Sequence, residues 1–235
     1  MIFWAGTASD DVRVVVEHYP AQPLPTRKLE AVSVPGRNGD VLFIENAFEN
    51  IEQEYDIYVS AERPRLPVVA RAVAAWLYGP AGYQRLEDSY DLDHYRIAYY
   101  EGPTDIENVL NRFGRATIAF NCKPQRYLKA GENAVQLTAA GELRNPTAFD
   151  ALPLLRIYGS GEGALNIGAY SVTVSDIDGY IDIDCETQNA YKGGENLNAG
   201  VAFSPDCPRL VPGVNAVSWS GGITSVQITP RWWEL

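Results

Sequence analysis

The chain has 235 residues, of which 46% are hydrophobic and 21% charged, the balance of a folded globular protein. Thirty Asp and Glu against nineteen Lys and Arg give a formal charge of −11. Nucleic-acid binding needs clustered Lys and Arg to neutralise phosphates, so this charge argues against a protein that grips DNA or RNA. An acidic surface would suit a wall past which DNA slides, although solubility alone also accounts for it.

The start of the chain and its cysteines indicate the compartment. Residues 1–4 begin no secretory signal, and no segment approaches the roughly 20 apolar residues of a membrane span, so we expect synthesis in the cytoplasm and no membrane insertion. Cys122, Cys185 and Cys207 have no CxxC spacing. This argues against a zinc site or a disulfide framework and predicts buried free thiols.

The first half of the chain is typical of β-strands around one helix. The β-branched run at 12–19 and the period-two alternation at 54–60 indicate strands. Apolar residues at 66, 69, 70, 73, 76 and 77 form one stripe at helical spacing, with Pro67 in the first turn. We therefore predict a helix over about 65–78 that packs on a sheet. Further strands are expected at 83–86, 95–100 and 115–120.

Residues 32–44 form the clearest local motif, a β-hairpin. Pro35-Gly36 interrupts the incoming apolar strand, and Asn38-Gly39 predicts a type I′ turn. Arg37 and Asp40 flank this turn at a solvent-facing tip, where an ion pair is worth at most about 1 kcal/mol. We therefore expect the tip to contact another molecule. The candidate assembly interface consists of Arg37, Asn38, Gly39 and Asp40.

The second half is predicted to be an all-β sandwich. Hydrophobic runs thin out between 128 and 150, which places a domain boundary there and divides the chain into residues 1–130 and 131–235. Asp178-Gly179 is predicted to be a hairpin turn, and the glycine-rich stretch 159–163 a flexible turn. The two tryptophans near the end predict a docked C-terminus. Short strands are expected at 154–158, 164–167, 171–174, 180–184, 216–220 and 224–229.

No set of residues predicts catalysis. The two histidines, His18 and His94, stand in no nucleophile motif, and the glycines at 159–163 lack the lysine and helix of a phosphate loop. The spacing of the four acidic residues at 176, 178, 182 and 184 does not match a calcium loop, so we expect them on a solvated sheet face. We predict no enzyme, no cofactor and no metal.

Short motifs over almost the whole chain resemble, in their order and spacing, the distal tail proteins of long-tailed, non-contractile bacteriophages, the siphophages. The motifs are VPGRNGD at 34–40, AWLY at 75–78, YQRLED at 83–88, YR at 95–96, FNCKP at 120–124, NPT at 145–147, PLLRIYGSG at 153–161, YIDID at 180–184, LVPGVN at 210–215 and PRWWEL at 230–235.

The resemblance implies a structural virion protein with two domains, encoded by a phage or a prophage. Its first domain would form a hexameric ring, and its second would be a galectin-like β-sandwich. Such a protein lies at the distal end of the virion tail and joins the tail tube to the baseplate or tail tip. Its implied partners are the tail-tube protein and a tail-associated fibre, lysin or baseplate protein, and DNA passes through the ring without specific binding.

The residues leave two other classes of function open. One is a carbohydrate-binding protein whose second domain stacks sugars of the host surface on Tyr170, Tyr180, Tyr191 or Trp219. The other is a glycosidase, which would need two carboxylates roughly 5–10 Å apart. The sequence singles out no such carboxylate pair.

Overall fold

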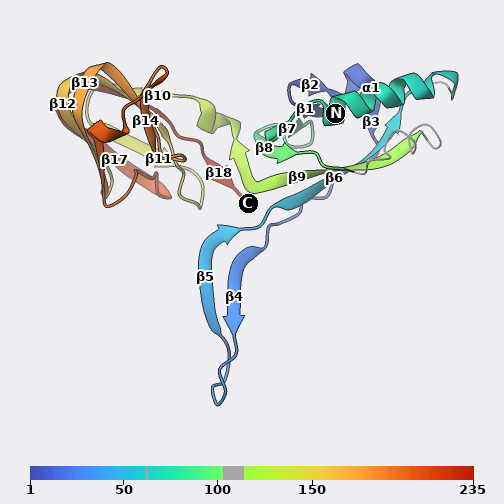
Figure 1. Ribbon diagram of the computed structural model, residues 1–235, viewed down its shortest axis with the longest axis horizontal. Helices are drawn as coiled ribbons and strands as arrows, with labels where there is room; N and C mark the ends of the chain where they lie inside the picture. Colours follow the sequence, from blue (N-terminus) through green and yellow to red (C-terminus); the bar gives the residue numbers. More distant parts are fainter. Residues whose placement is uncertain (62, 103–113) are drawn as a thin grey trace. The chain divides into compact units, whose positions relative to one another are not determined.

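The computed structural model describes residues 1–61, 63–102 and 114–235. Two compact units can be distinguished: Met1–Arg126 together with Leu235, and Tyr127–Glu234 (Figure 1). Each unit has its own hydrophobic core. Strands dominate both, and the described residues contain one α-helix, α1 (Leu66–Tyr78), which confirms the predicted mainly β fold with one helix. No described helix is long and apolar enough to cross a membrane.

The first unit is a curved antiparallel sheet with α1 packed into its core. The strands follow the order β2-β1-β7-β8-β9-β6-β3, and β4 and β5 form a separate two-stranded sheet. Short 3-10 turns, η1 (Ser9–Val12) and η2 (Arg63–Arg65), precede β3 and α1. The strands are β1 (Ile2–Trp4), β2 (Thr7–Ala8), β3 (Val14–Val16), β4 (Arg27–Val32), β5 (Val41–Phe48), β6 (Ile51–Val59), β7 (Gln84–Asp88), β8 (His94–Tyr99) and β9 (Arg115–Leu128).

Two periodicities seen in the sequence explain how this core is built. Strand β6 alternates buried and exposed residues along its whole length, so one face of it packs inward. In α1 the predicted apolar stripe is the buried face: Val69, Ala70, Val73, Trp76 and Leu77 are all buried. Both elements therefore place a continuous apolar surface against the same core.

The second unit is built from eight strands, three of which are unusually long. The order is β10-β17-β12-β13-β14-β15, with β11 paired to β17 and β16 paired to β13. Single 3-10 turns, η3 (Lys129–Glu132) and η4 (Asn198–Gly200), are its only helical segments among the described residues. The strands are β10 (Val135–Leu137), β11 (Gly141–Asn145), β12 (Leu154–Ile167), β13 (Tyr170–Asp184), β14 (Asn189–Lys192), β15 (Glu195–Asn196), β16 (Val201–Ser204) and β17 (Gly213–Thr229), and β18 (Trp233–Glu234) ends the chain.

The prediction of six short strands in this half was wrong in one respect, because the structure joins them in pairs. Strands β12, β13 and β17 each run through a glycine-containing stretch that the sequence suggested was a turn. The glycines allow two backbones to approach closely where the strands bend: a Cβ on Gly159 would lie 2.2 Å from the Gly222 carbonyl oxygen. The register shifts at Gly161/Gly163 mark a bulge at the same place.

The predicted hairpin turn at Asp178-Gly179 was also wrong. Gly179 lies within β13, directly opposite Gly159 of β12, and has a φ of +78°. Glycine adopts a positive φ both in turns and at irregular positions within strands, so the dipeptide does not distinguish the two. The dipeptide therefore marks a local irregularity in a continuous strand.

Two arginine–carboxylate pairs replace the solvated acidic face that the sequence suggested for the second unit. Asp182 is only 5% exposed, and Arg156 donates to both of its carboxylate oxygens, at 2.6 and 2.8 Å. Arg231 likewise contacts both oxygens of Asp184, at 2.7 and 3.1 Å. These carboxylates are therefore used as ion-pair partners, and Arg231 thereby ties the C-terminal segment to the end of β13.

Other buried groups complete the two cores. Trp232 is buried, and Trp233 stacks on Phe149 with ring centroids 4.5 Å apart, so the C-terminal tryptophans are docked as predicted. The three cysteines are buried free thiols. Burial raises the pKa of the Cys122 thiol to about 12, which keeps it protonated and unreactive at neutral pH.

Candidate functional site: an exposed hairpin arm

The predicted hairpin is present as a two-stranded arm, β4 and β5, that projects from the first unit (Figure 1). Its paired residues run from Arg27 opposite Phe48 to Val32 opposite Val41. All six residues of β4 are exposed. An isolated two-stranded ribbon is only marginally stable in water, so the arm is a surface that a partner would stabilise.

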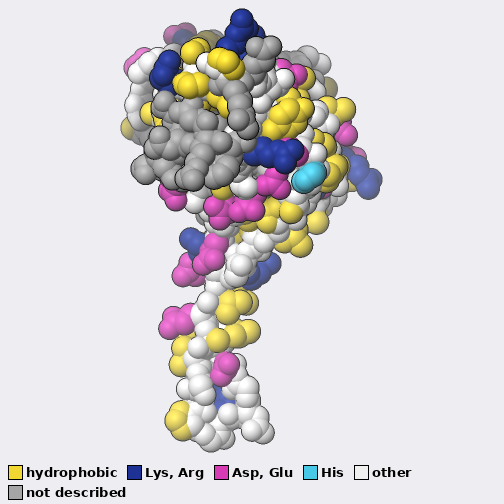
Figure 2. Space-filling model, turned by 90° about the vertical axis from the view of Figure 1, so that its right-hand side faces the viewer, with side chains coloured by type: hydrophobic (Ala, Val, Ile, Leu, Met, Phe, Trp, Pro, Cys, Tyr) yellow, Lys and Arg dark blue, Asp and Glu magenta, His cyan; other side chains and the backbone are white. Residues whose placement is uncertain are grey.

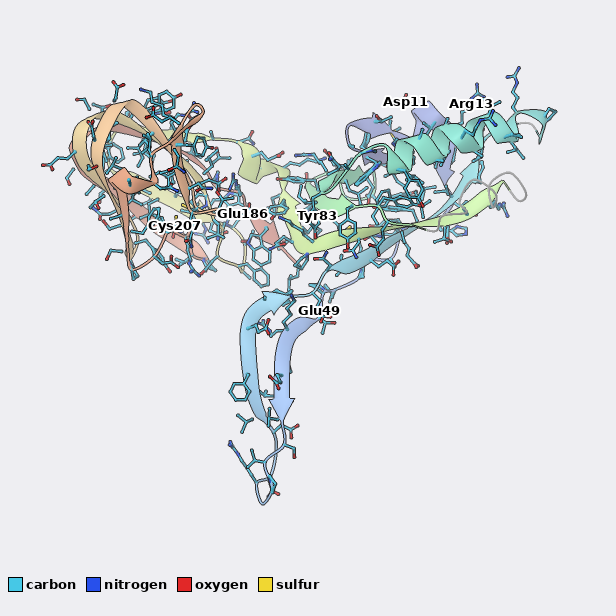
Figure 3. The ribbon with its side chains drawn as sticks, in the orientation of Figure 1. Asp11, Arg13, Glu49, Tyr83, Glu186 and Cys207 are labelled. Carbon is cyan, nitrogen blue, oxygen red and sulfur yellow. The ribbon has the colours of Figure 1, made fainter. Side chains whose placement is uncertain are left out.

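The base of the arm is anchored while the rest is free of the core. At the base the Glu49 amide donates to the Thr26 carbonyl at 2.9 Å, and the Arg27 guanidinium lies 4.7 Å from the centre of the Phe48 ring. Figure 3 shows Glu49 at this junction, where β5 leads into β6. These contacts set the direction in which the arm leaves the sheet.

The tip has a different turn from the one predicted. The Arg37 amide donates to the Val34 carbonyl at 3.1 Å, and Gly36 has a φ of +80°. A hydrogen bond across four residues, with Pro35 second and a positive-φ glycine third, is a type II turn. Asn38 does not have positive φ, so the predicted type I′ turn over Asn38-Gly39 was wrong. The Pro-Gly pair is the stronger local signal because proline fixes its own φ.

The four predicted contact residues lie together at this tip. Arg37, Asn38, Gly39 and Asp40 are all exposed. Within the described part of the chain, no ion pair joins Arg37 to Asp40. Both charges therefore face solvent, where a partner could reach them.

The stem of the arm carries a second surface that the sequence analysis missed. Residues that pair directly across two strands lie on the same face, and so do residues two apart along one strand. Leu29 pairs with Ile44 and Ala31 pairs with Leu42, so these four side chains lie on one face of the arm. This set, the aliphatic face, has no polar member. Its large side chains remain 48% (Leu29), 55% (Leu42) and 52% (Ile44) exposed. Yellow hydrophobic side chains line the arm in Figure 2.

The aliphatic face was readable in principle from the sequence. Residues 29 and 31 precede the tip, and 42 and 44 follow it, each two apart as on one side of a strand. Pairing them needs the hairpin register, however, and the mistaken turn type assigns a different loop length to the hairpin. The aliphatic stem and the charged tip together form the candidate assembly surface.

The four aromatic residues considered for sugar binding do not form one site. Tyr180 of β13 and Tyr191 of β14 lie on the same sheet face, because Tyr191 pairs with Asp182. Trp219 packs against the core, and Tyr170 pairs with Ile167 at the far end of β13. Tyr158 of β12, which pairs directly with Tyr180, was not considered.

No arrangement of the described residues suggests a metal site or a catalytic set. No group of three or more His, Cys, Asp and Glu among them could hold a metal ion. The Nδ1 atom of His94 lies 2.6 Å from Asp91, at the edge of the first core, with no serine or cysteine in that pair. Asp178 pairs with Lys192 at 2.9 Å.

Comparison with known proteins relates part of this chain to a phage tail protein family and its whole fold to that of a phage hub protein. Residues 15–122 match the family model of the phage tail protein RIFT-related domain. The solved Dit protein (gp 19.1) of SPP1, described as a paradigm of the hub adsorption apparatus in phages that infect Gram-positive bacteria, has the same fold. It is 16% identical, with a TM-score of 0.76 over 100% of this chain and 98% of that chain.

No curated protein matches the sequence. The matched family model nevertheless describes a phage tail protein domain, and the shared fold is that of a solved phage tail hub protein. The resemblance to distal tail proteins that the sequence motifs suggested is thereby confirmed. Residues 15–122 form a phage tail protein RIFT-related domain, and the whole chain has the fold of a siphophage distal tail protein.

Proposed function

We propose that this protein is the distal tail hub of a siphophage or prophage, a hexameric ring that joins the tail tube to the baseplate or tail tip. The observation that carries the proposal is the exposed arm. It combines an aliphatic stem with a charged tip, and both are exposed among the residues that the structure describes. An arm of one subunit that docks on a different surface of the next makes a head-to-tail contact, the kind that closes into a ring.

The arm has the composition expected of a specific contact. Stable subunit interfaces bury about 1,200–2,000 Å² in total and have an apolar centre with a polar rim. The aliphatic face would supply the centre, and Arg37 and Asp40 the rim. The proposal extends the tip interface predicted from the sequence to the whole outer part of the arm.

The charge of the first unit fits the passage of DNA. Glu52, Glu54 and Asp56 are exposed in a row on the outer face of β6. Carboxylates on a channel wall repel phosphates, so DNA would pass without adhering. Under this proposal the neighbours of the ring are the tail-tube protein on one side and a tail-associated fibre, lysin or baseplate protein on the other. The protein would be made in the host cytoplasm and reside at the distal end of the tail.

The proposal is tested by the solution mass of the purified protein. Light scattering at several concentrations, with negative-stain images of the same sample, should give about six times 25.9 kDa and rings with a central hole. A protein that stays monomeric alone is then mixed with the tail-tube protein, which would act as a template. A monomer in both conditions refutes the ring.

The tip is tested separately with Arg37→Ala and Asp40→Ala combined. We expect fewer or less stable rings because the rim charges are lost. The control combines Glu142→Ala and Arg144→Ala, two exposed and oppositely charged residues of β11 in the second unit. If the tip variant forms rings as readily as this control, the tip is not an assembly contact.

A further inference from the structure

One face of the second unit carries an open cup between β12, β13 and β17. Its volume is about 550 Å³. Tyr158 and Ser160 project from β12 on this face, and Gly179 of β13 contributes no side chain to fill the space. Hydroxyl and amide groups from neighbouring strands complete the lining: Thr224, Ser225 and Gln136. None of the lining side chains carries a charge.

Aromatic rings stand at one side of this cup. Tyr158 and Tyr180 pair across β12 and β13, with ring centroids 6.4 Å apart and planes inclined by 49°. The Tyr158 hydroxyl donates to Gln227 at 3.4 Å, which orients that ring. The Arg156 guanidinium lies 4.8 Å from the centre of the Tyr180 ring. The Tyr158 ring is therefore held in place before any ligand arrives, and the neighbouring Tyr180 ring, with Arg156 and Lys192 over it, supports it from the side.

The charges beside the rings neutralise one another. Arg156 is bound by both oxygens of Asp182, and Lys192 lies 2.9 Å from an Asp178 oxygen. Two of the five N–H donors of Arg156 are used in this pair, and the guanidinium also hydrogen-bonds to Tyr158. A site with its cations already paired does not favour a phosphate or a carboxylate. It favours an uncharged molecule with many hydroxyl groups.

We propose that this cup binds an uncharged saccharide unit of an oligo- or polysaccharide. The C–H face of a sugar ring would lie on Tyr158, whose ring is packed beside that of Tyr180, and its hydroxyls would exchange hydrogen bonds with Ser160, Ser225 and Gln136. The side chains that do this are already ordered by hydrogen bonds and ring contacts, which lowers the entropic cost of binding. Because the cup is open, the sugar can be part of a chain.

The inference concerns the second unit alone and does not depend on the ring. A hub with this cup would touch a surface glycan in addition to joining tail components. A monomeric protein could bind sugar equally well, so the outcome of the mass measurement leaves this test unaffected.

The test uses the full chain on an array of uncharged and acidic oligosaccharides, followed by titration calorimetry with the strongest uncharged oligosaccharide. The variant combines Tyr158→Ala and Tyr180→Ala, and Tyr170→Ala at the far end of β13 is the control. We expect the double variant to bind at least tenfold more weakly and the control to match the wild type. Tyr180→Phe, which keeps the ring, should retain binding, and thermal unfolding of the double variant at the wild-type temperature shows that its loss of binding is not unfolding.

Three results would overturn the proposal. They are an array on which no uncharged oligosaccharide binds, binding restricted to acidic oligosaccharides, and binding that the double variant and the control retain equally. The third result would place sugar binding elsewhere on the molecule.

Discussion

Replacing Leu42 and Ile44 by serine removes most of the aliphatic face without touching either core. About half of each side chain is exposed, 55% and 52%, and is available for burial by a partner. Full burial of such a side chain is worth about 1.5–3 kcal/mol, so the exposed halves of two contribute roughly 1.5–3 kcal/mol to each contact. We therefore expect association between subunits to weaken by about 10- to 150-fold.

The assay is the concentration dependence of the solution mass, measured by light scattering for wild type and variant. Val68→Ser with Leu92→Ser serves as the control, since these side chains are also exposed, at 61% and 71%, but lie outside the arm. Thermal unfolding should change little in both variants, because none of the four side chains belongs to either hydrophobic core. A variant that assembles at the same concentrations as the control would refute the reasoning that the aliphatic face is an interface.

Two predictions concern the stability of the second unit. Gly222→Ala places a Cβ 1.7 Å from the Ser160 carbonyl oxygen, so we expect a loss of roughly 3 kcal/mol in urea unfolding, whereas Gly194→Ala, which meets nothing, should be nearly neutral. Partial burial acts to raise the pKa of the Asp184 carboxyl, but the hydrogen bonds and charge of Arg231 outweigh it and lower the pKa. This lowered pKa contributes its full stability at any pH above the pKa of the carboxyl in the unfolded chain, about 3.9. The contribution is lost as the pH falls through the lower pKa of the folded state. Wild type should therefore lose more unfolding free energy than Asp184→Asn between about pH 5 and 2, and parallel pH curves would contradict this.

Local periodicity was enough to predict α1 and β6 of the first unit, whereas residues 27–30 and 45–48, which the sequence suggested were a link and a loop, belong to β4 and β5. The stripe from Val69 to Leu77 specifies a helix with one buried side, and the alternation in β6 specifies a strand with one buried face. Both signals come from residues close in sequence. The spacing of the apolar residues already puts them on one side of the element, and that side is the one buried in the folded chain. The hairpin at residues 32–44 was predicted from its turn dipeptides, which are also local signals.

Turn chemistry was less decisive, because glycine permits conformations without selecting one. At the tip two candidate turns competed, and the Pro35-Gly36 turn formed in preference to Asn38-Gly39. At Gly159 and Gly179 the same permissiveness serves a bend within long strands, where another backbone passes too close for a side chain. No local pattern distinguishes these uses.

The sequence by itself determined that this protein is mainly β, where its helix lies and that a charged hairpin tip reaches solvent. Only the tertiary structure decided which residues share a surface. Leu29 meets Ile44, and Tyr158 meets Tyr180, through strand registers that join residues 15 and 22 positions apart. A register shift of one residue moves every side chain to the opposite face, so both candidate surfaces depend on pairings between strands that composition and periodicity do not specify.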